Sequence, residues 1–525
     1  MKFRRVVPSL MAVAALGAAA CAPMVDPGPP PPPGPLTPDL LGRYTTGLGN
    51  TSGETVAFGG GKMYVTNTAG GGSVDVVSIA DPALPVRTLR ISTAAFGLPN
   101  SVAVKGNRMA VAVEAPVKTN PGKVLVFDLD GFLLATATVG ALPDMVTFAP
   151  DGTKLLVSNE AEPNSNYSID PEGSVSVVDI TSAPTLNPLP VTTIGFTDFN
   201  VGGPRAAEIV PGIRIFGPGA TVAKDLEPEY IAVDPSGATA WVTLQENNAM
   251  AKIDLGTNTV ISISPLGLKD HSLADNAFDP SDQDGIDIDN WPVNGMYQPD
   301  SVAVVMTNGV PYLITANEGD ARDYSPTFNE EIRVGAGSYV LDPTVFPNAA
   351  SLKNNLNLGR LTVSKASGDT DGDGDFDRID VYGARSFTVW DQNSAKVYDS
   401  GDDIEQLVAM TRPTRFNVSS DNNTLDNRSD NKGPEPEGVA TGIVDGRTYA
   451  FVGLERDGGI LVVDVSDPFA PVIESLISSR DYTVAAAPDS GPEVLTFVPA
   501  SESPTNRPLL LTAFEISGTV TITEL

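Results

Sequence analysis

Hydrophobic and polar residues alternate in short runs along most of the chain, from residue 41 onward, and Gly, Pro, Asn and Asp separate the runs. A period of two residues is typical of strands with one buried face, and the separating residues favour tight turns. Stretches with helical periodicity are few. The pattern therefore predicts an all-β protein.

One unit of this pattern recurs seven times. Most copies open with Pro and a polar residue, run through a strand, a turn and a second strand that ends in Glu, and continue into a third strand. The opening residues are Glu54, Asn100, Asp144, Glu229, Asp300, Glu437 and Glu493. The residues that end the second strand are Thr68, Glu114, Glu160, Glu246, Glu318, Glu455 and Glu515.

The spacing of the units is typical of a β-propeller. The first two intervals are 46 and 44 residues, which suits a four-stranded blade with its loops, and the longest interval, from Asp300 to Glu437, indicates an insertion. We expect a seven-bladed β-propeller with long loop insertions over residues 41–525. Residues 41–48 would supply the strand missing after Glu515 and close the ring. A parallel solenoid is the alternative, but the antiparallel hairpins of each unit disfavour it.

Twelve of the fourteen repeat positions are acidic. Because the start of one strand in a hairpin lies beside the end of its partner, we expect these residues to line one mouth of the central channel. Such clustered carboxylates raise each other's pKa unless cations neutralise them. The expected metal ligands are Glu229, Glu246, Asp300, Glu318, Glu437 and Glu455, and the basic residues nearby are Lys224, Arg322, Lys432 and Arg456. The alternative is that each carboxylate caps backbone N–H groups of the adjacent blade.

The insertion at about residues 320–390 carries the sharpest local motif, DTDGDGDFDRID. Oxygen ligands on alternate residues, Gly at the sixth position and an acid at the twelfth match an EF-hand-like calcium loop. The predicted calcium ligands are Asp369, Asp371, Asp373, Asp375, Asp377 and Asp380. A solvated acidic loop is the alternative, and a bound ion would stiffen the insertion.

A second acidic run, from Asp279 to Asp289, follows His271, the single histidine of the chain. The spacing of this run matches no loop that we can name. His271 is either a ligand or proton carrier, or a hydrogen-bonded structural residue.

The N-terminus has the pattern of an export signal. A basic start is followed by an apolar run that is too short to span a bilayer and ends in small residues, so we expect a signal peptide over residues 1–20. Cys21 follows directly, and we expect it to be lipidated, although ordinary signal-peptide cleavage would cut the same bond. Residues 21–40 then form a Pro-rich tether. These features predict a cell-envelope lipoprotein, or otherwise a periplasmic or secreted protein.

The formal net charge of −32 argues against nucleic acid as a partner, because phosphates need a basic face. A single Cys excludes an intramolecular disulfide and a thiolate zinc cluster, and a single His excludes multi-His metal sites. The composition suits an exported protein that holds cations.

The chain resembles the choice-of-anchor I family of bacterial surface and secreted proteins over residues 41–525. The resemblance rests on the segments WVTLQENNAMAKIDL, ANEGDARDY, DTDGDGDFDRIDVYGARSFTVWD, RSDNKGPEPEGV and FVGLERDGGILVVDVSDP. It implies a propeller, and relatives often carry an alkaline-phosphatase label.

Two functions follow as hypotheses. The first is a calcium-stabilised surface propeller that binds a ligand or a protein partner. The second is a calcium-dependent phosphoesterase, similar to alkaline phosphatase or phytase, whose mouth carboxylates hold calcium and bind a small phosphorylated ligand. Its candidate catalytic residues are Arg322, Lys432, Arg456 and His271. No G-x-S-x-G or phosphate-cradling P-loop sequence occurs.

Overall fold

The computed structural model describes residues 34–525 apart from residues 51, 421 and 485–487. The expected signal peptide, Cys21 and most of the expected tether therefore lie outside the described residues. Residues 36–525 form one compact unit. Among the described residues, no helix is long and apolar enough to cross a bilayer.

The described residues contain seven antiparallel sheets of four strands each. The first is β2 (Ser52–Gly59), β3 (Lys62–Asn67), β4 (Ser73–Ser78) and β5 (Val86–Ser92). The second is β6 (Pro99–Lys105), β7 (Arg108–Val113), β8 (Pro121–Asp128) and β9 (Leu133–Ala141). The third is β10 (Pro143–Phe148), β11 (Lys154–Asn159), β12 (Ser174–Asp179) and β13 (Val191–Gly195). The fourth is β14 (Pro228–Val233), β15 (Thr239–Leu244), β16 (Ala249–Asp254) and β17 (Thr259–Pro265).

The remaining three sheets follow the same order. The fifth is β20 (Val302–Thr307), β21 (Val310–Ala316), β27 (Phe387–Asp391) and β28 (Lys396–Asp399). The sixth is β29 (Pro436–Val444), β30 (Arg447–Leu454), β31 (Gly459–Asp464) and β32 (Val472–Ile477). The seventh is β33 (Pro492–Val498), β34 (Leu509–Phe514), β35 (Thr519–Glu524) and the N-terminal strand β1 (Asp39–Thr45).

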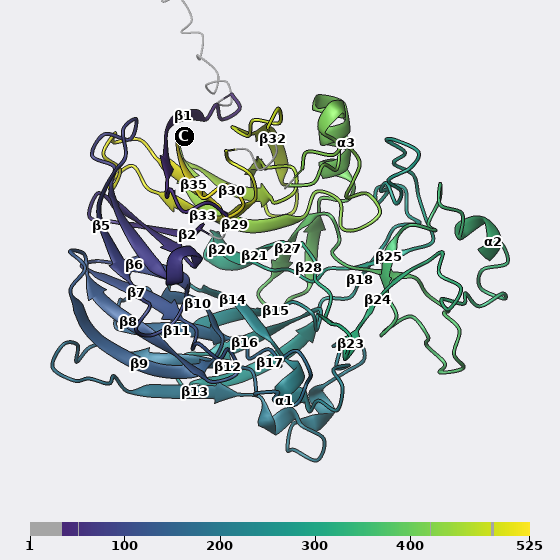
Figure 1. Cartoon of the computed structure of the whole chain (residues 1–525), viewed down its shortest axis with the longest axis horizontal. Coiled ribbons are helices and arrows are strands. Elements are labelled where there is room, and N and C mark those ends of the chain that lie inside the picture. The colour runs from purple at the N-terminus through teal and green to yellow at the C-terminus, as the bar shows by residue number, and fades with distance from the viewer. Residues whose placement is uncertain (1–33, 51, 421, 485–487) are drawn as a thin grey trace, which may run out of the picture. The chain divides into compact units, whose positions relative to one another are not determined.

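The first strands of the sheets form a closed inner ring. Contacts run from β2 to β6, β10, β14, β20, β29, β33 and back to β2, and Figure 1 shows the sheets arranged around this centre. The second strands are nearly continuous apolar runs, because each sheet packs between two neighbouring sheets and both of its faces are buried there. The outermost strand β5 is mostly exposed. The expectation of an all-β propeller is confirmed.

The two ends of the described chain close the ring together. β1 pairs antiparallel with β35, from Asp39 opposite Glu524 to Thr45 opposite Thr519. In Figure 1 the purple N-terminal strand accordingly lies beside the yellow C-terminal strands. The expected closing strand therefore exists, and it begins two residues earlier than residue 41.

The long insertion separates β21, which ends at Ala316, from β27, which begins at Phe387. Its short strands are β22 (Asp323–Tyr324), β23 (Phe328–Asn329), β24 (Glu331–Arg333), β25 (Thr362–Ser364) and β26 (Asp380–Val381). β26 joins β18 (Leu268–Asp270) and β19 (Asn294–Met296) in a separate sheet. The insertion packs around a separate hydrophobic cluster that it shares with Phe278 and Val293 of the preceding connection, and in it the rings of Tyr339 and Phe376 stack with centroids 4.0 Å apart.

The helices are short and lie in the connections. They are α1 (Val222–Asp225), α2 (Ala349–Leu352), α3 (Asp403–Thr411) and the 3₁₀ turns η1 (Ala69–Gly71), η2 (Thr197–Phe199), η3 (Ala206–Glu208) and η4 (Pro413–Arg415). The insertion leaves and re-enters the fifth sheet through a close contact of two glycines. A Cβ atom on Gly319, whose φ is 83°, would lie 2.0 Å from the nitrogen of Gly383. Glycine is therefore required at this crossing.

Candidate functional site

The hairpin register places the opening and closing residues of each sheet side by side. Pro436 pairs with Leu454, directly before Glu455, and Pro143 pairs with Asn159, directly before Glu160. A bulge follows the opening proline in both sheets, which redirects the opening acid away from regular pairing.

A recurring backbone hydrogen bond fixes this arrangement. The N–H of the closing acid donates to the carbonyl oxygen of the residue before the opening proline. The bonds are Glu114 to Leu98 at 2.9 Å, Glu160 to Leu142 at 2.9 Å, Glu455 to Glu435 at 2.8 Å and Glu515 to Gly491 at 3.0 Å. The repeated sequence thus brings an acid from each of two neighbouring strands to the same edge of a blade.

Five of the seven opening residues border a cavity of about 770 Å³ between the inner strands. Asn100, Asp144, Glu229, Asp300 and Glu493 all line it. The structure therefore brings together opening residues that are hundreds of positions apart in the sequence.

Most of these acids have no cationic partner. Of the twelve acidic repeat positions, Glu318 and Glu455 alone form an ion pair within the described residues. Burial, followed by repulsion from Glu160 and Glu246, raises the pKa of Glu229 well above its usual value. Burial also raises the pKa of Glu54, Asp144 and Glu246 to about 7. The ring is therefore poised to take up either protons or cations.

Glu318, Glu435 and Glu455 form a group whose carboxylate oxygens lie within 4.8 Å of one another. Lys432 Nζ lies 2.5 Å from Glu318 Oε1 and 3.1 Å from Glu435 Oε2. Arg456 lies 3.1 Å from Glu435 and 3.1 Å from Glu455. Although burial opposes it, the charges of Lys432, Arg456 and Arg428 lower the pKa of Glu435 below its usual range. Two of the candidate catalytic residues, Lys432 and Arg456, are thus paired with carboxylates.

Arg322 is buried beside the rim of the mouth. Its guanidinium lies 2.5 Å from Asp225 and 3.0 Å from Glu227, and its side chain is 2% exposed. The charges of Glu227 and Asp225 outweigh burial and raise the pKa of Arg322. A guanidinium held in this way is not presented to a ligand in the cavity. Lys224 lies away from this pair, 4.0 Å from Asp170.

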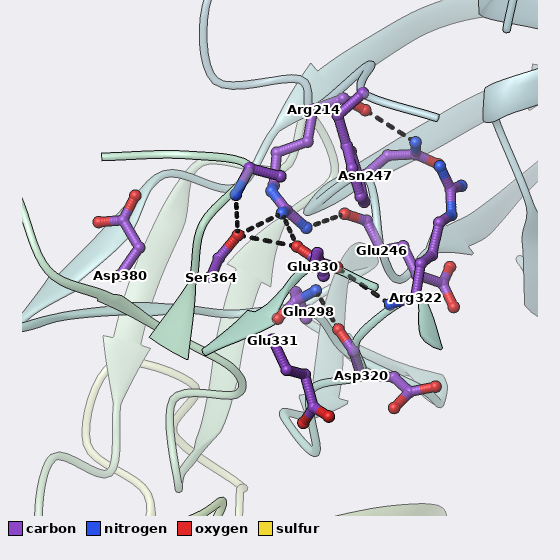
Figure 2. A network of polar contacts seen from close by, with 12 residues as sticks. Arg214, Glu246, Asn247, Gln298, Asp320, Arg322, Glu330, Glu331, Ser364 and Asp380 are labelled. Atoms are coloured by element: carbon purple, nitrogen blue, oxygen red, sulfur yellow. Dashed lines mark hydrogen bonds and ion pairs between the residues drawn. The ribbon is translucent and has the colours of Figure 1, made fainter. Parts of the chain in front are cut away.

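A polar network links the insertion to this rim (Figure 2). Glu330 accepts hydrogen bonds from Arg214 at 2.5 Å, from Ser364 at 2.8 Å and from the N–H of Arg322 at 3.0 Å. Arg214 also donates to the backbone oxygen of Glu246 at 2.7 Å. The insertion therefore helps to hold both Arg322 and Glu246 in place.

His271 lies in the connection between the fourth and fifth sheets and is 1% exposed. Its Nδ1 lies 2.7 Å from the backbone oxygen of Asn276, and its ring centroid lies 4.5 Å from that of Phe278. Burial, together with the charge of Lys269, lowers the pKa of His271 well below its usual value. A buried neutral imidazole fits the structural alternative.

The predicted calcium loop is divided into two groups. Asp369, Asp371 and Asp373 have carboxylate oxygens within 4.8 Å of one another, and Asp375 and Asp377 form a second such group with Asp342. The structure does not bring Asp380 into either group. The Asp380 carboxylate is 1% exposed and accepts hydrogen bonds from Arg378 at 2.6 and 2.7 Å, because β26 carries it into a buried sheet.

The structure adds acids that the repeat pattern missed. Glu227 and Glu435 each lie two positions before an opening acid and are almost completely buried. A signal existed in the sequence, since Glu-Pro-Glu occurs at residues 227–229 and again at 435–437. In both segments the first Glu is paired with a buried base and the second belongs to the ring.

Backbone capping at these edges is performed partly by asparagine. Asn67 accepts a hydrogen bond from the N–H of Gly53 at 3.1 Å, and Asn247 accepts one from Glu227 at 3.3 Å. Within the described residues, burial and neighbouring charges act on the carboxylates of Glu160, Glu229 and Asp300, and no hydrogen bond does. Capping therefore does not account for these three acids.

The comparison with family models decides the assignment. Residues 55–468 match the model described as the choice-of-anchor I domain. The chain belongs to the choice-of-anchor I family. Membership indicates a surface or secreted protein.

Two curated proteins resemble parts of this choice-of-anchor I chain. Gigasin-3a of Magallana gigas is 32% identical over 188 residues, which are 33% of this chain and 66% of that protein. The mesenchyme-specific cell surface glycoprotein of Strongylocentrotus purpuratus is 30% identical over 297 residues, which are 49% of this chain and 37% of that protein. The matches thus span less than two thirds of the length of either relative.

The solved structures that resemble this one are distant from it in sequence. Hydrazine synthase of Kuenenia stuttgartiensis is 12% identical with a TM-score of 0.46, and the match covers 92% of this chain and 97% of that chain. The WD40 domain of coronin from Toxoplasma gondii is 8% identical with a TM-score of 0.43, covering 94% and 88%.

Proposed function

We propose that this protein is an exported, membrane-anchored propeller that binds calcium at its mouth and, through the bound calcium, a small anionic or phosphorylated ligand. The observation that carries the proposal is the set of acidic repeat positions without an ion pair, several of which border the 770 Å³ cavity.

Physical chemistry supports a cation in this position. Buried carboxylates that repel one another are costly unless protons or cations neutralise them. Calcium binds six to eight oxygen atoms in flexible geometry, and a ring of carboxylates from several strands supplies such ligands. A calcium ion that keeps open positions would also attract phosphate or carboxylate groups of a ligand.

Calorimetric titration of residues 22–525 with calcium chloride tests the proposal. The double variant Glu229→Gln/Asp300→Asn should lose at least one bound calcium ion. Asp445→Asn is the matched control, because this exposed acid lies at the opposite end of its hairpin, between β29 and β30. Equal calcium binding by the ring variant, the control and the natural chain would overturn the proposal.

The anchor is the second part of the proposal. Lipidated Cys21, followed by the Pro-rich segment, would hold the propeller at a membrane surface, and two or three acyl chains would anchor it stably. Cys21→Ser should move the protein from the membrane fraction to the soluble fraction. Retention of the Ser variant in the membrane would exclude a lipid anchor at this position.

A calcium-dependent phosphomonoesterase is the second candidate. The observation in its favour is that Lys432 and Arg456 lie within the acidic group of Glu318, Glu435 and Glu455, so cations and carboxylates share one site. Calcium-dependent phosphate release from a generic phosphomonoester, lost in Glu318→Gln, would establish this activity. Calcium binding without phosphate release would leave the binding propeller.

A further inference from the structure

The propeller has two ends, and the acidic mouth occupies one of them. The register of the seventh sheet shows which residues lie at the other end. Val498, the last residue of β33, pairs with Leu509. Leu509 pairs with Glu524, and Glu524 pairs with Asp39. Because the mouth residue Glu493 stands at the start of β33, Asp39 and the beginning of β1 lie at the end of the propeller away from the mouth.

The chain enters the propeller at this end. Leu36 is the first residue of the compact unit, and its N–H donates to the carboxylate of Glu474 on β32 at 2.7 Å. Residues 22–35 alone separate Leu36 from Cys21, the proposed lipid anchor. A polyproline II stretch of that length spans about 45 Å. A lipid on Cys21 would therefore hold this end of the propeller near the bilayer surface.

Large apolar side chains are exposed beside the entry point. Phe469, in the turn between β31 and β32, is 63% exposed, and Val472, at the start of β32, is 57% exposed. Ile443, near the end of β29, is 65% exposed. Met306 and Val310 are exposed in the hairpin of β20 and β21. We name these five residues the rim patch.

Two neighbouring blades form the rim patch together. The ring of Phe469, from the sixth sheet, packs edge-on against Tyr312 of the fifth sheet, with centroids 5.7 Å apart. Met306 pairs with Pro311, the neighbour of Tyr312. The inner strands β20 and β29 are in contact, and Met306 and Ile443 lie near the same end of them. Exposed apolar side chains gathered in this way are typical of a surface that contacts an apolar partner.

A lipid bilayer is the partner that fits this position. The rim patch lies beside the strand that binds Leu36, so an anchor at Cys21 brings it to the membrane without help from another protein. Aromatic and aliphatic side chains bind bilayers by entering the boundary between headgroups and acyl chains. The net charge of −32 opposes attraction to anionic lipids, so apolar contact has to supply the affinity.

We propose that the rim patch is a membrane-docking surface, which lays the end of the propeller opposite the mouth on the bilayer and leaves the acidic mouth open to solvent. The choice of a bilayer as the occupant rests on the anchor in the proposed function. The docking itself requires no calcium.

Chemical coupling to vesicles tests the docking surface. Cys21 is the single cysteine, so coupling its thiol to a maleimide lipid attaches the chain from Cys21 to Leu525 at the proposed position, whether or not a cell lipidates it. The vesicles are phosphatidylcholine with or without brominated acyl chains, in EDTA. The fluorescence that Phe469→Trp adds to that of the natural chain should fall by at least half in the brominated vesicles. Val117→Trp is the control, because Val117 is 56% exposed in the short loop between β7 and β8 at the mouth end, and its added fluorescence should not change.

A second set of variants tests the remaining residues of the rim patch. Adding Ile443→Ser and Val472→Ser to the Phe469→Trp chain should reduce the quenching at least twofold, whereas adding Val117→Ser should leave it unchanged. Equal quenching at positions 469 and 117 would overturn the docking surface. No quenching at position 469 would also overturn it, and would leave the rim patch to a protein partner. Failure of the natural anchor is measured separately, by the fractionation of Cys21→Ser, and failure of the calcium site by calorimetry.

Discussion

Arg322 Nη2 lies 3.0 Å from Glu227 Oε2, and each of these two side chains is 2% exposed. Lys432 and Glu435 repeat the relationship at the second Glu-Pro-Glu segment, with 3.1 Å between Nζ and Oε2. In both segments the first Glu is fixed by a buried base, and the second Glu belongs to the acidic ring. In each segment the first Glu thus forms a structural ion pair, and the Glu two positions later belongs to the acidic ring of the mouth.

Arg322→Met should lower the free energy of unfolding by about 3–5 kcal/mol, because it leaves the carboxylates of Asp225 and Glu227 buried without a partner. The loss is measured by urea denaturation at pH 7. Arg507→Met is the control, since Arg507 is 63% exposed beside Glu524 and a surface ion pair contributes at most about 1 kcal/mol. Equal losses in the two variants would contradict the structural role of Arg322.

Tyr44→Phe should destabilise the closure of the ring. The Tyr44 hydroxyl donates to the buried carboxylate of Asp75 at 2.6 Å and so ties β1 to the first sheet. Losing a hydrogen bond to a charged group costs about 1.5–3 kcal/mol, which thermal and urea unfolding would detect. Leu40→Ala is the control on the same strand, because Leu40 is 43% exposed. A Phe variant as stable as the natural chain would contradict this role of Tyr44.

Stability of the calcium-free protein should fall as the pH rises from about 4 to about 7. Burial raises the pKa values of Glu54, Asp144 and Glu246 to about 7 in the folded state, above those of the unfolded chain. These groups therefore stabilise the fold while protonated, and the contribution is lost as the pH rises through the folded pKa values. In EDTA, the unfolding midpoint should therefore be lower at pH 8 than at pH 5, and calcium should reduce this difference. A midpoint in EDTA that rises over this pH interval would contradict the prediction.

Asp380→Asn and Asp373→Asn should act differently. Asp380 is bound by Arg378 inside a sheet, so Asp380→Asn should lower stability and leave calcium binding by the loop unchanged. Asp373 belongs to the exposed group with Asp369 and Asp371, so Asp373→Asn should weaken calcium binding and leave stability nearly unchanged. If Asp380→Asn lost the calcium ion of the loop, Asp380 would be a calcium ligand at the twelfth position, as the sequence spacing predicts, and this prediction would be wrong.

The repeat predicted most of the fold, because blade strands and turns leave a local pattern in the residues. It also placed the opening and closing acids on one edge, since hairpin register is a local property. The partners of the basic residues could not be predicted in this way. Arg322 pairs with Glu227, and Lys432 pairs with Glu318, across long loops. The spacing of residues along the sequence does not predict contacts of this kind. Asp380 was assigned to the loop because the spacing does not reveal that β26 buries it.

Anomalous diffraction from crystals grown in calcium tests the central claim most directly. The proposed function predicts a peak at the propeller mouth, with carboxylate oxygens of the acidic ring, Glu229 and Asp300 among them, at roughly 2.3–2.6 Å from it. A mouth without any calcium peak, in crystals whose exposed loop binds the ion, would contradict the claim that the acidic ring is a cation site.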